Sequence, residues 1–234
     1  MIFVIESSGG FAETARRISD TLRHHYKFIE FVIPSYAMSA ATILVMSGDA
    51  FHMDYYSVLG PIDPQIDDGS GNLIPASGYL IKYEELLRKA NKGNIGTAEL
   101  RILLSFDQGK LHYYEQGRDL SRSLLEEWLV KYKFKDWCET ETRRLPVTPA
   151  MKKKRATEVA NKLNDTRKWN SHGMGISREV LVNDLNLRVE DFGADAKINT
   201  LIKSYHKLLL DYMAANNYVR ITHTRANWRY GEGG

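Results

Sequence analysis

The chain opens with a pattern that constrains its fold strongly: an apolar run, a turn of small residues and a helical stretch. Residues 2–5 are apolar, residues 6–10 end in two glycines, and residues 11–26 carry apolar or small side chains at helical spacing. A second apolar run follows at residues 28–33. Strand, helix and strand in quick succession predict a βαβ unit, with a parallel strand pair and a right-handed crossover. The predicted fold class is therefore α/β.

The same pattern returns at residues 34–46. Pro34 ends the second apolar run, and the small and apolar residues 39–46 predict a helix that is buried on all sides. Residues 50–53 and 57–59 then read as short strands. At both strand-to-helix turns we expect backbone N–H groups, and at Ser39 also a hydroxyl, to face a ligand.

The rest of the chain is mainly helical in period. Because residues 2–5 are apolar on both faces, we expect them to form a buried strand with a neighbour on each side. Residues 67–71 are predicted to be an exposed loop, residues 187–193 a short extended piece, and residues 222–234 a loose tail. Helices are predicted at residues 79–91, 149–163, 178–185 and 196–216, and Thr148 and Ser177 are expected to be the N-caps of the second and third of these. Residues 97–132 are predicted to form one helix or two, because residues 107–109 and Gly117 are weak points.

These elements suggest one domain with three parts. The parts are a core at residues 1–145, a helical region of the same domain at residues 146–217, and a flexible tail at residues 218–234.

Composition excludes several classes of partner. The 32 basic and 29 acidic residues leave a net charge of only +3, and the basic run at residues 152–155 reads as a solvated helix face, so we expect no nucleic acid. The single cysteine, Cys138, cannot form an internal disulfide, which fits the cytoplasm. No apolar stretch approaches the roughly 20 residues of a membrane helix. The histidines lack metal-ligand spacing, so neither a metal nor a cofactor is predicted.

Each candidate residue has a structural reading beside the functional one. Ser39 at the start of a helix is most simply an N-cap, but a hydroxyl in such a turn also suits a nucleophile. Gly9 and Gly10 are ordinary turn glycines, unless they let a substrate carbonyl approach the main chain and accept an N–H hydrogen bond.

Several segments together resemble a known family. Four segments carry this resemblance: Ile5 to Gly10, Ser39 to Leu44, Gly60 to Gln65, and Ser171 to Ser177. Through them the chain resembles the serine peptidases of the Clp and signal-peptide-peptidase A group, and more closely the prokaryotic serine dehydrogenase proteinase family. The resemblance implies a Clp/crotonase-like spiral of ββα units with a mostly parallel sheet, followed by a helical C-terminal half. It also implies Ser39 as the nucleophile, with the N–H groups of Gly10 and Ala40 as the oxyanion hole.

The base of such a site is left open. The Clp histidine position is occupied here by Pro64, next to Asp63. Lys89 and Lys92 lie at a charged helix end, which argues against the burial that a lysine base needs. Asp63 between two prolines reads as a turn cap, and His172 lies far along the chain. None of the four candidate bases, Asp63, Lys89, Lys92 and His172, is favoured. A chain that begins at Met1 also lacks the strands that precede the glycine turn in relatives. For these two reasons we expect weak or no peptidase activity.

Two functions remain open at this stage. The first is a serine peptidase acting on peptides or unfolded proteins, and the alternative is a catalytically weak or inactive peptide-binding subunit of the same fold. An acyl-CoA enzyme of the crotonase fold is less favoured, because it would not need Ser39. The resemblance further implies a homo-oligomer and association with the membrane periphery.

Overall fold

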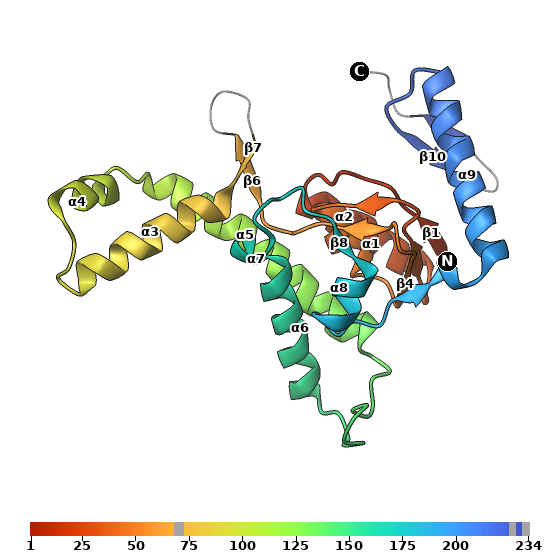
Figure 1. Ribbon diagram of the computed structural model, residues 1–234, viewed down its shortest axis with the longest axis horizontal. Helices are drawn as coiled ribbons and strands as arrows, with labels where there is room; N and C mark the ends of the chain where they lie inside the picture. Colours follow the sequence, from red (N-terminus) through yellow and green to blue (C-terminus); the bar gives the residue numbers. More distant parts are fainter. Residues whose placement is uncertain (68–72, 225–227, 231–234) are drawn as a thin grey trace.

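The main sheet is parallel and has the strand order β1-β2-β4-β9. A computed structural model describes residues 1–67, 73–224 and 228–230 of the chain. The four strands are β1 (Ile2–Val4), β2 (Glu30–Val32), β4 (Ala50–Met53) and β9 (Glu190–Asp191), and all of their pairings are parallel. The predicted α/β class and the predicted parallel pair are therefore confirmed (Figure 1).

One expectation for this sheet is wrong. β1 was predicted to be buried on both faces, but it is an edge strand, and its Ile2 side chain is 63% exposed. Apolar character alone does not tell an edge strand from a central one, because both positions favour the same residue types.

A second, smaller sheet has the strand order β3-β5-β8. β3 (Tyr36–Ala37) pairs in parallel with β5 (Val58–Leu59), which pairs antiparallel with β8 (Ile176–Ser177). Ser7 forms an isolated parallel bridge with Ala37 and so extends this sheet by one residue.

The two sheets are built by a repeat along the chain. β1, the Ser7 bridge and helix α1 (Ala12–His25) form a first unit, and β2, β3 and helix α2 (Ala40–Val45) form a second. β4 and β5 repeat the two strands a third time. Each unit places one strand in the main sheet and the next in the small sheet, which is the predicted succession of ββα units.

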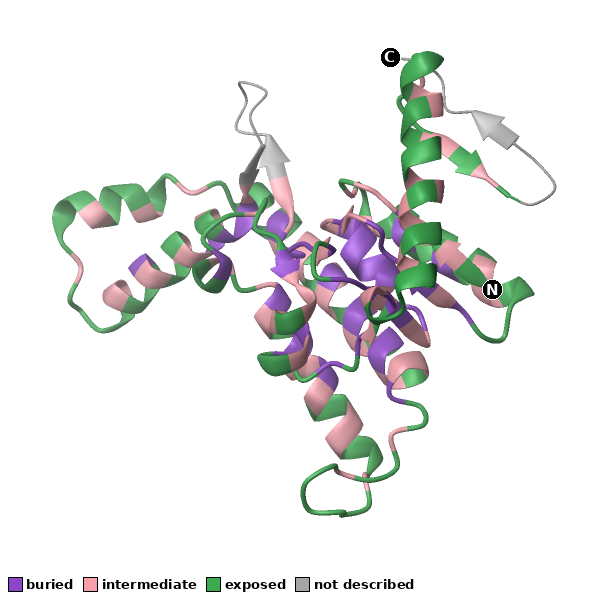
Figure 2. Cartoon of the chain, turned by 45° about the vertical axis from the view of Figure 1, so that its right-hand side comes forward, coloured by how far each residue is buried: buried purple, intermediate pink, exposed green. Residues whose placement is uncertain are grey.

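The main hydrophobic core lies around α2, whose six residues are all buried as predicted. Helices from the C-terminal half of the chain close the same core through Trp128 and Val159 (Figure 2). These helices are α5 (Gln108–Trp128), which continues as a π-helical turn at Leu129–Lys133, α6 (Pro149–Leu163), α7 (Thr166–Trp169) and α8 (Arg178–Asn183).

The predicted helix starts are confirmed by their caps. Thr148 accepts the N–H of Met151, and Ser177 accepts the N–H of Val180. The stretch at residues 97–132 is two helices, because Asp107 caps α5 by accepting the N–H of Lys110. Gly117 lies inside α5 and does not break it.

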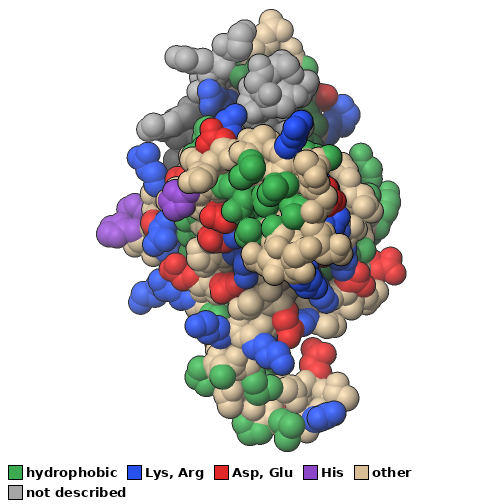
Figure 3. All heavy atoms as spheres, turned by 90° about the vertical axis from the view of Figure 1, so that its left-hand side faces the viewer, with side chains coloured by type: hydrophobic (Ala, Val, Ile, Leu, Met, Phe, Trp, Pro, Cys, Tyr) green, Lys and Arg blue, Asp and Glu red, His purple; other side chains and the backbone are tan. Residues whose placement is uncertain are grey.

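A helical arm projects from the core (Figure 1). It consists of α3 (Ala76–Asn91), α4 (Thr97–Leu104) and the first part of α5, and a small cluster of its own holds it together. Figure 3 views the molecule from the side on which this arm projects, and on that surface basic and acidic side chains are interspersed, with apolar side chains among them. The cluster contains Ala76, Leu80, Leu111 and Tyr114, with Tyr79, Tyr83 and Phe106 packed against it.

Helix α9 (Ala196–Ala215) follows a 3-10 turn at Phe192–Ala194 and has no buried residue (Figure 2). Beyond α9, β10 (Ile221–His223) and β11 (Trp228–Tyr230) pair as an antiparallel hairpin, where the composition had suggested a loose tail. Another hairpin joins β6 (Gln65–Asp67) to β7 (Leu73–Pro75). Most of the predicted loop at residues 67–71 lies outside the described residues. In the part of the chain that the structure describes, none of the helices has the length and apolar character needed to cross a membrane.

Candidate active site

Three turns meet at one edge of the small sheet because the ββα repeat brings each unit back to the same place. Gly9 follows the Ser7 bridge, Ser39 follows β3, and Gly60 follows β5. Since these segments run in parallel, their carboxyl ends share one edge. Thr42 of α2 ties the turns together, because its Oγ1 lies 2.7 Å from the carbonyl oxygen of Ala37 and accepts the N–H of Gly60 at 3.0 Å.

Ser39 has a strained backbone. Its φ of 52° and ψ of −120° lie outside the favoured regions for a residue with a side chain. Ser39 occupies the N-cap position of α2, yet its hydroxyl makes no capping hydrogen bond, so the simple N-cap reading is wrong. The side chain is partly exposed. A reactive hydroxyl on a sharp, strained turn between a strand and a helix is the arrangement of a nucleophile elbow.

Gly9 packs directly against this turn. A Cβ built on Gly9 would lie 2.8 Å from the Ser39 Cβ and 2.8 Å from the carbonyl oxygen of Met38, and Gly9 has a φ of +109°. No other residue type fits there without moving the backbone. A Cβ on Gly10, by contrast, would meet nothing within 4 Å, so Gly10 borders open space. Gly10, which the resemblance implied for the oxyanion hole, thus borders open space, and Gly9 makes the close contact with Ser39.

Two backbone donors are free at this point. The N–H of Gly9 donates to the Ser7 Oγ at 3.1 Å. Across the described residues, the N–H groups of Gly10 and Ala40 donate no hydrogen bond to another residue. Unpaired N–H groups beside a free hydroxyl are what an oxyanion hole requires.

Asp63 and His172 form a pair at the same edge. The Nδ1 of His172 lies 3.0 Å from the Oδ1 of Asp63, although 109 residues separate them in the chain. The Asp63 side chain is fully buried and that of His172 is 14% exposed. The structure thus brings His172, which lies far along the chain, next to Asp63. Its signal in the sequence was the apolar Ile176 just after it, which forms β8 and fixes the segment beside β5.

The two lysines considered as bases lie elsewhere. Lys89 binds Glu99 at 2.6 Å on the arm, and this hydrogen bond raises the pKa of the Lys89 ammonium, so it retains its proton. Lys92 caps α3 at the outer end of the arm and is exposed.

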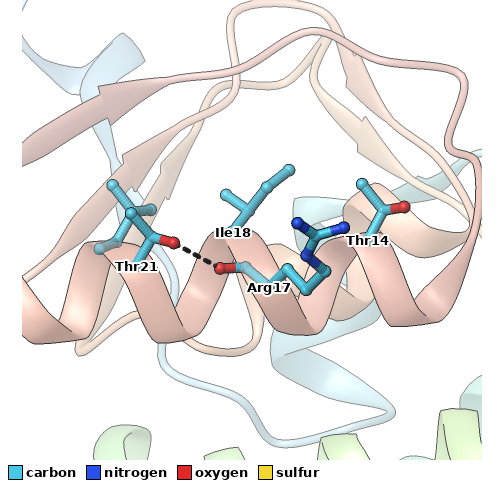
Figure 4. A pocket seen from close by; sticks show the side chains of 5 residues that line it. Thr14, Arg17, Ile18 and Thr21 are labelled. Atoms are coloured by element: carbon cyan, nitrogen blue, oxygen red, sulfur yellow. Dashed lines mark hydrogen bonds between the residues drawn. The ribbon is translucent and has the colours of Figure 1, made fainter.

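A surface pocket described by the structure lies apart from these residues. Among the described residues, no group of three His, Cys, Asp or Glu side chains is placed to hold a metal ion. A pocket of about 340 Å³ lies on α1 and is lined by Thr14, Arg17, Ile18, Thr21 and Leu22 (Figure 4). Since all five come from one helix face, it is a surface hollow separate from the three turns.

Residues 1–92 match the family described as ClpP-like SDH-type serine proteinase. This N-terminal part of the chain is therefore similar to that family. The family segment contains Gly9, Gly10, Ser39 and Asp63, whereas His172 lies beyond it.

Two relatives come from Methanocaldococcus jannaschii. Uncharacterized protein MJ1495 is 29% identical over 113 residues, which cover 48% of this chain and 35% of the relative. Uncharacterized protein MJ0137 is 36% identical over 63 residues, which cover 27% of this chain and 22% of the relative. The matches thus span about a third or less of each relative's length. No solved structure matches this chain.

Proposed function

We propose that this chain is a serine peptidase, with Ser39 as nucleophile and the N–H groups of Gly10 and Ala40 as the oxyanion hole. The observation that carries the proposal is the strained, uncapped Ser39 on a turn packed against Gly9. The similarity of residues 1–92 to a serine proteinase family supports it.

The chemistry follows the usual acyl-transfer course. The Ser39 Oγ attacks the carbonyl carbon of a peptide bond and loses its proton to a base. The carbonyl oxygen gains negative charge, which the two free N–H groups stabilise; losing one such donor costs about 10²–10³ in rate. The amine then leaves with the proton, and water hydrolyses the acyl-enzyme.

The substrate class we propose is a peptide or an unfolded protein segment, because an extended chain can lie along the exposed turn edge. We further propose that the protein works as a homo-oligomer. Apolar side chains of α9 such as Leu201 and Leu208, each 61% exposed, support this, since large exposed apolar areas commonly mark interfaces. An exposed free thiol at Cys138 fits a reducing compartment such as the cytoplasm.

A fluorophosphonate probe tests the nucleophile. We expect covalent labelling of the intact chain, with the adduct mapped to Ser39 by mass spectrometry, and loss of at least about 99% of the labelling in Ser39→Ala. Ser47→Ala is a matched control, because Ser47 is a buried serine whose hydroxyl donates to the carbonyl of Leu44. A folded wild-type chain that takes up no label would favour the alternative, a peptide-binding subunit without catalysis.

A further inference from the structure

We propose that the amine of Lys133 is an acylation site, at which a small activated acyl donor, an acyl phosphate or an acyl thioester, transfers its acyl group to the chain. The site lies beside β4 of the main sheet. The inference does not depend on Ser39 or on the proposed peptidase function.

The first argument is the place of Lys133 in the chain. Lys133 is the last residue of the π-helical turn that continues α5, and across this turn the N–H of Phe134 donates to the carbonyl oxygen of Leu129 at 2.7 Å. A π-helical turn inserts one extra residue into a helix and is frequent at functional sites. Leu129 and Phe134 are both buried, so the turn holds Lys133 against the core.

The second argument is what surrounds the Lys133 ammonium. Its Nζ lies 4.3 Å from the centre of the Phe51 ring, and Phe51 is fully buried. Across the described residues, this Nζ forms neither a hydrogen bond nor an ion pair. An aromatic face replaces only part of the hydration that an ammonium loses on burial, so the charged form of Lys133 is disfavoured.

Other lysines beside aromatic rings differ from Lys133 in one respect. Lys135, Lys168 and Lys203 also lie over rings, but each of them binds a carboxylate. The hydrogen bond to Asp54, for example, raises the pKa of the Lys203 amine, which therefore keeps its proton.

The third argument is the charge state that these surroundings produce. Burial lowers the pKa of the Lys133 amine to about 8. Of the charged groups around it, Glu190, Asp49 and Glu30 act to raise this pKa, and Arg188 acts to lower it. About one amine in ten is then neutral at pH 7, against fewer than about one in a thousand at the ordinary lysine pKa of about 10.4. Only the neutral amine has the lone pair that attacks a carbonyl carbon.

The reaction is an acyl transfer that needs no further reactant. The Lys133 side chain is partly exposed and its Nζ keeps contact with solvent, so a small donor can reach it. A C–N bond forms between Nζ and the carbonyl carbon of the donor, while the C–O bond to phosphate or the C–S bond to the thiol breaks. The phosphate or thiolate leaves with the electron pair of that bond, and the nitrogen releases one proton to water. The product is an uncharged amide, which no longer bears the cost of burying an ammonium.

The test measures the acetylation rate of each lysine in the intact, folded chain by peptide mapping with mass spectrometry. Acetyl phosphate and an acetyl thioester are used in parallel, and the donor that reacts selectively identifies the source of the acyl group. The comparison lysine is Lys131, which is exposed and lies on the same turn. At neutral pH we expect Lys133 to react about tenfold faster than Lys131 with at least one donor, because its larger neutral fraction outweighs its lower basicity and access. The Lys133 rate should rise with a midpoint at about pH 8, and the selectivity should disappear in denaturing urea.

Two variants of one surface ion pair test the electrostatic cause. Arg188 binds Glu190 at 2.8 Å, and the two charges act on Lys133 in opposite directions. Glu190→Gln should raise the Lys133 rate at neutral pH about two- to threefold, and Arg188→Gln should lower it by a similar factor. Glu99→Gln is the control, because Glu99 binds Lys89 on the arm, and it should leave the Lys133 rate unchanged.

The proposal is overturned if Lys133 of the folded chain reacts no faster than Lys131 with either donor, or if the selectivity persists in urea. It is also overturned if Glu190→Gln and Arg188→Gln change the Lys133 rate in the same direction or not at all. Circular dichroism establishes that each variant is folded. The comparison with urea uses the wild-type chain alone and so decides the question even if a variant does not fold.

Discussion

At the scale of single residues, the site depends on Gly9, whose neighbour Gly10 was the glycine that the resemblance implied for the oxyanion hole. Gly9 lies against Ser39 with a φ of +109°, so any side chain there strains the backbone and clashes with the turn that carries Ser39. We expect Gly9→Ala to lower the free energy of unfolding by about 1–3 kcal/mol, measured by urea denaturation.

The matched control for Gly9→Ala is Gly78→Ala in α3. A Cβ on Gly78 meets nothing within 4 Å and lies in an exposed helical position. This second change should stabilise the protein by about 0.5–1 kcal/mol, because alanine loses less backbone entropy than glycine on folding. Equal effects of the two changes would contradict the close contact at Gly9.

At the scale of elements, Asp49 joins three parts of the fold. Its carboxylate accepts Arg23 of α1 at 2.8 Å, the N–H of Ile29 before β2 at 2.8 Å, and Lys135 after the π-helical turn. Burial raises the pKa of Asp49, but the hydrogen bonds from Lys135, Ile29 and Arg23 outweigh it and lower that pKa overall. The carboxylate is only 2% exposed, so screening by water is small.

The lowered pKa has a defined sign for stability. The ionised Asp49 stabilises the fold at pH values above the unfolded pKa of about 3.9, and this contribution is lost as the pH falls through the lower folded pKa. We expect Asp49→Asn to cost about 3 kcal/mol at pH 7, because Arg23 is left buried without its anion. The variant should also show a shallower loss of stability between about pH 4 and pH 2.

Asp20→Asn is the control for this prediction. Asp20 is paired with Arg16 at 3.6 Å on the exposed face of α1, where such a pair contributes at most about 0.5 kcal/mol. Denaturation curves across the pH range should therefore separate the two variants.

At the scale of the whole molecule, α9 is attached by polar contacts rather than by packing. Lys203 binds the buried Asp54 at 2.7 Å and His206 binds Glu6 at 2.7 Å, while no residue of α9 is buried. Burial raises the pKa of Asp54, but the hydrogen bonds from Lys203 and Ser57 lower it overall. Opening of α9 alone should thus need less free energy than unfolding of the core around α2.

Hydrogen exchange followed by mass spectrometry tests this difference. Amides of α9 should exchange faster than those of α2, and Lys203→Met should accelerate α9 at least about fivefold while leaving α2 unchanged, because it removes a charged hydrogen bond. Lys207→Met is the control, since Lys207 binds Asp211 of α9 itself and, among the described residues, no residue of the core. Equal acceleration by both changes would show that the Lys203 contact does not hold α9 to the core.

The sequence by itself determined the features that depend on neighbouring residues. The apolar runs at β1 and β2, the buried α2, the caps at Thr148 and Ser177, and the placement of Ser39 at a strand-to-helix turn all follow from local period and local hydrogen bonding. These features also carried the family resemblance.

Only the tertiary structure decided the contacts between distant segments. Asp63 and His172 meet because β8 pairs with β5, and a two-residue strand has too little period to be predicted from the residues around it. The edge position of β1 and the exposed face of α9 likewise depend on which element packs against which, a choice that apolar residues at the right spacing leave open. His172 was therefore visible in the sequence, but its pairing with Asp63 required the fold.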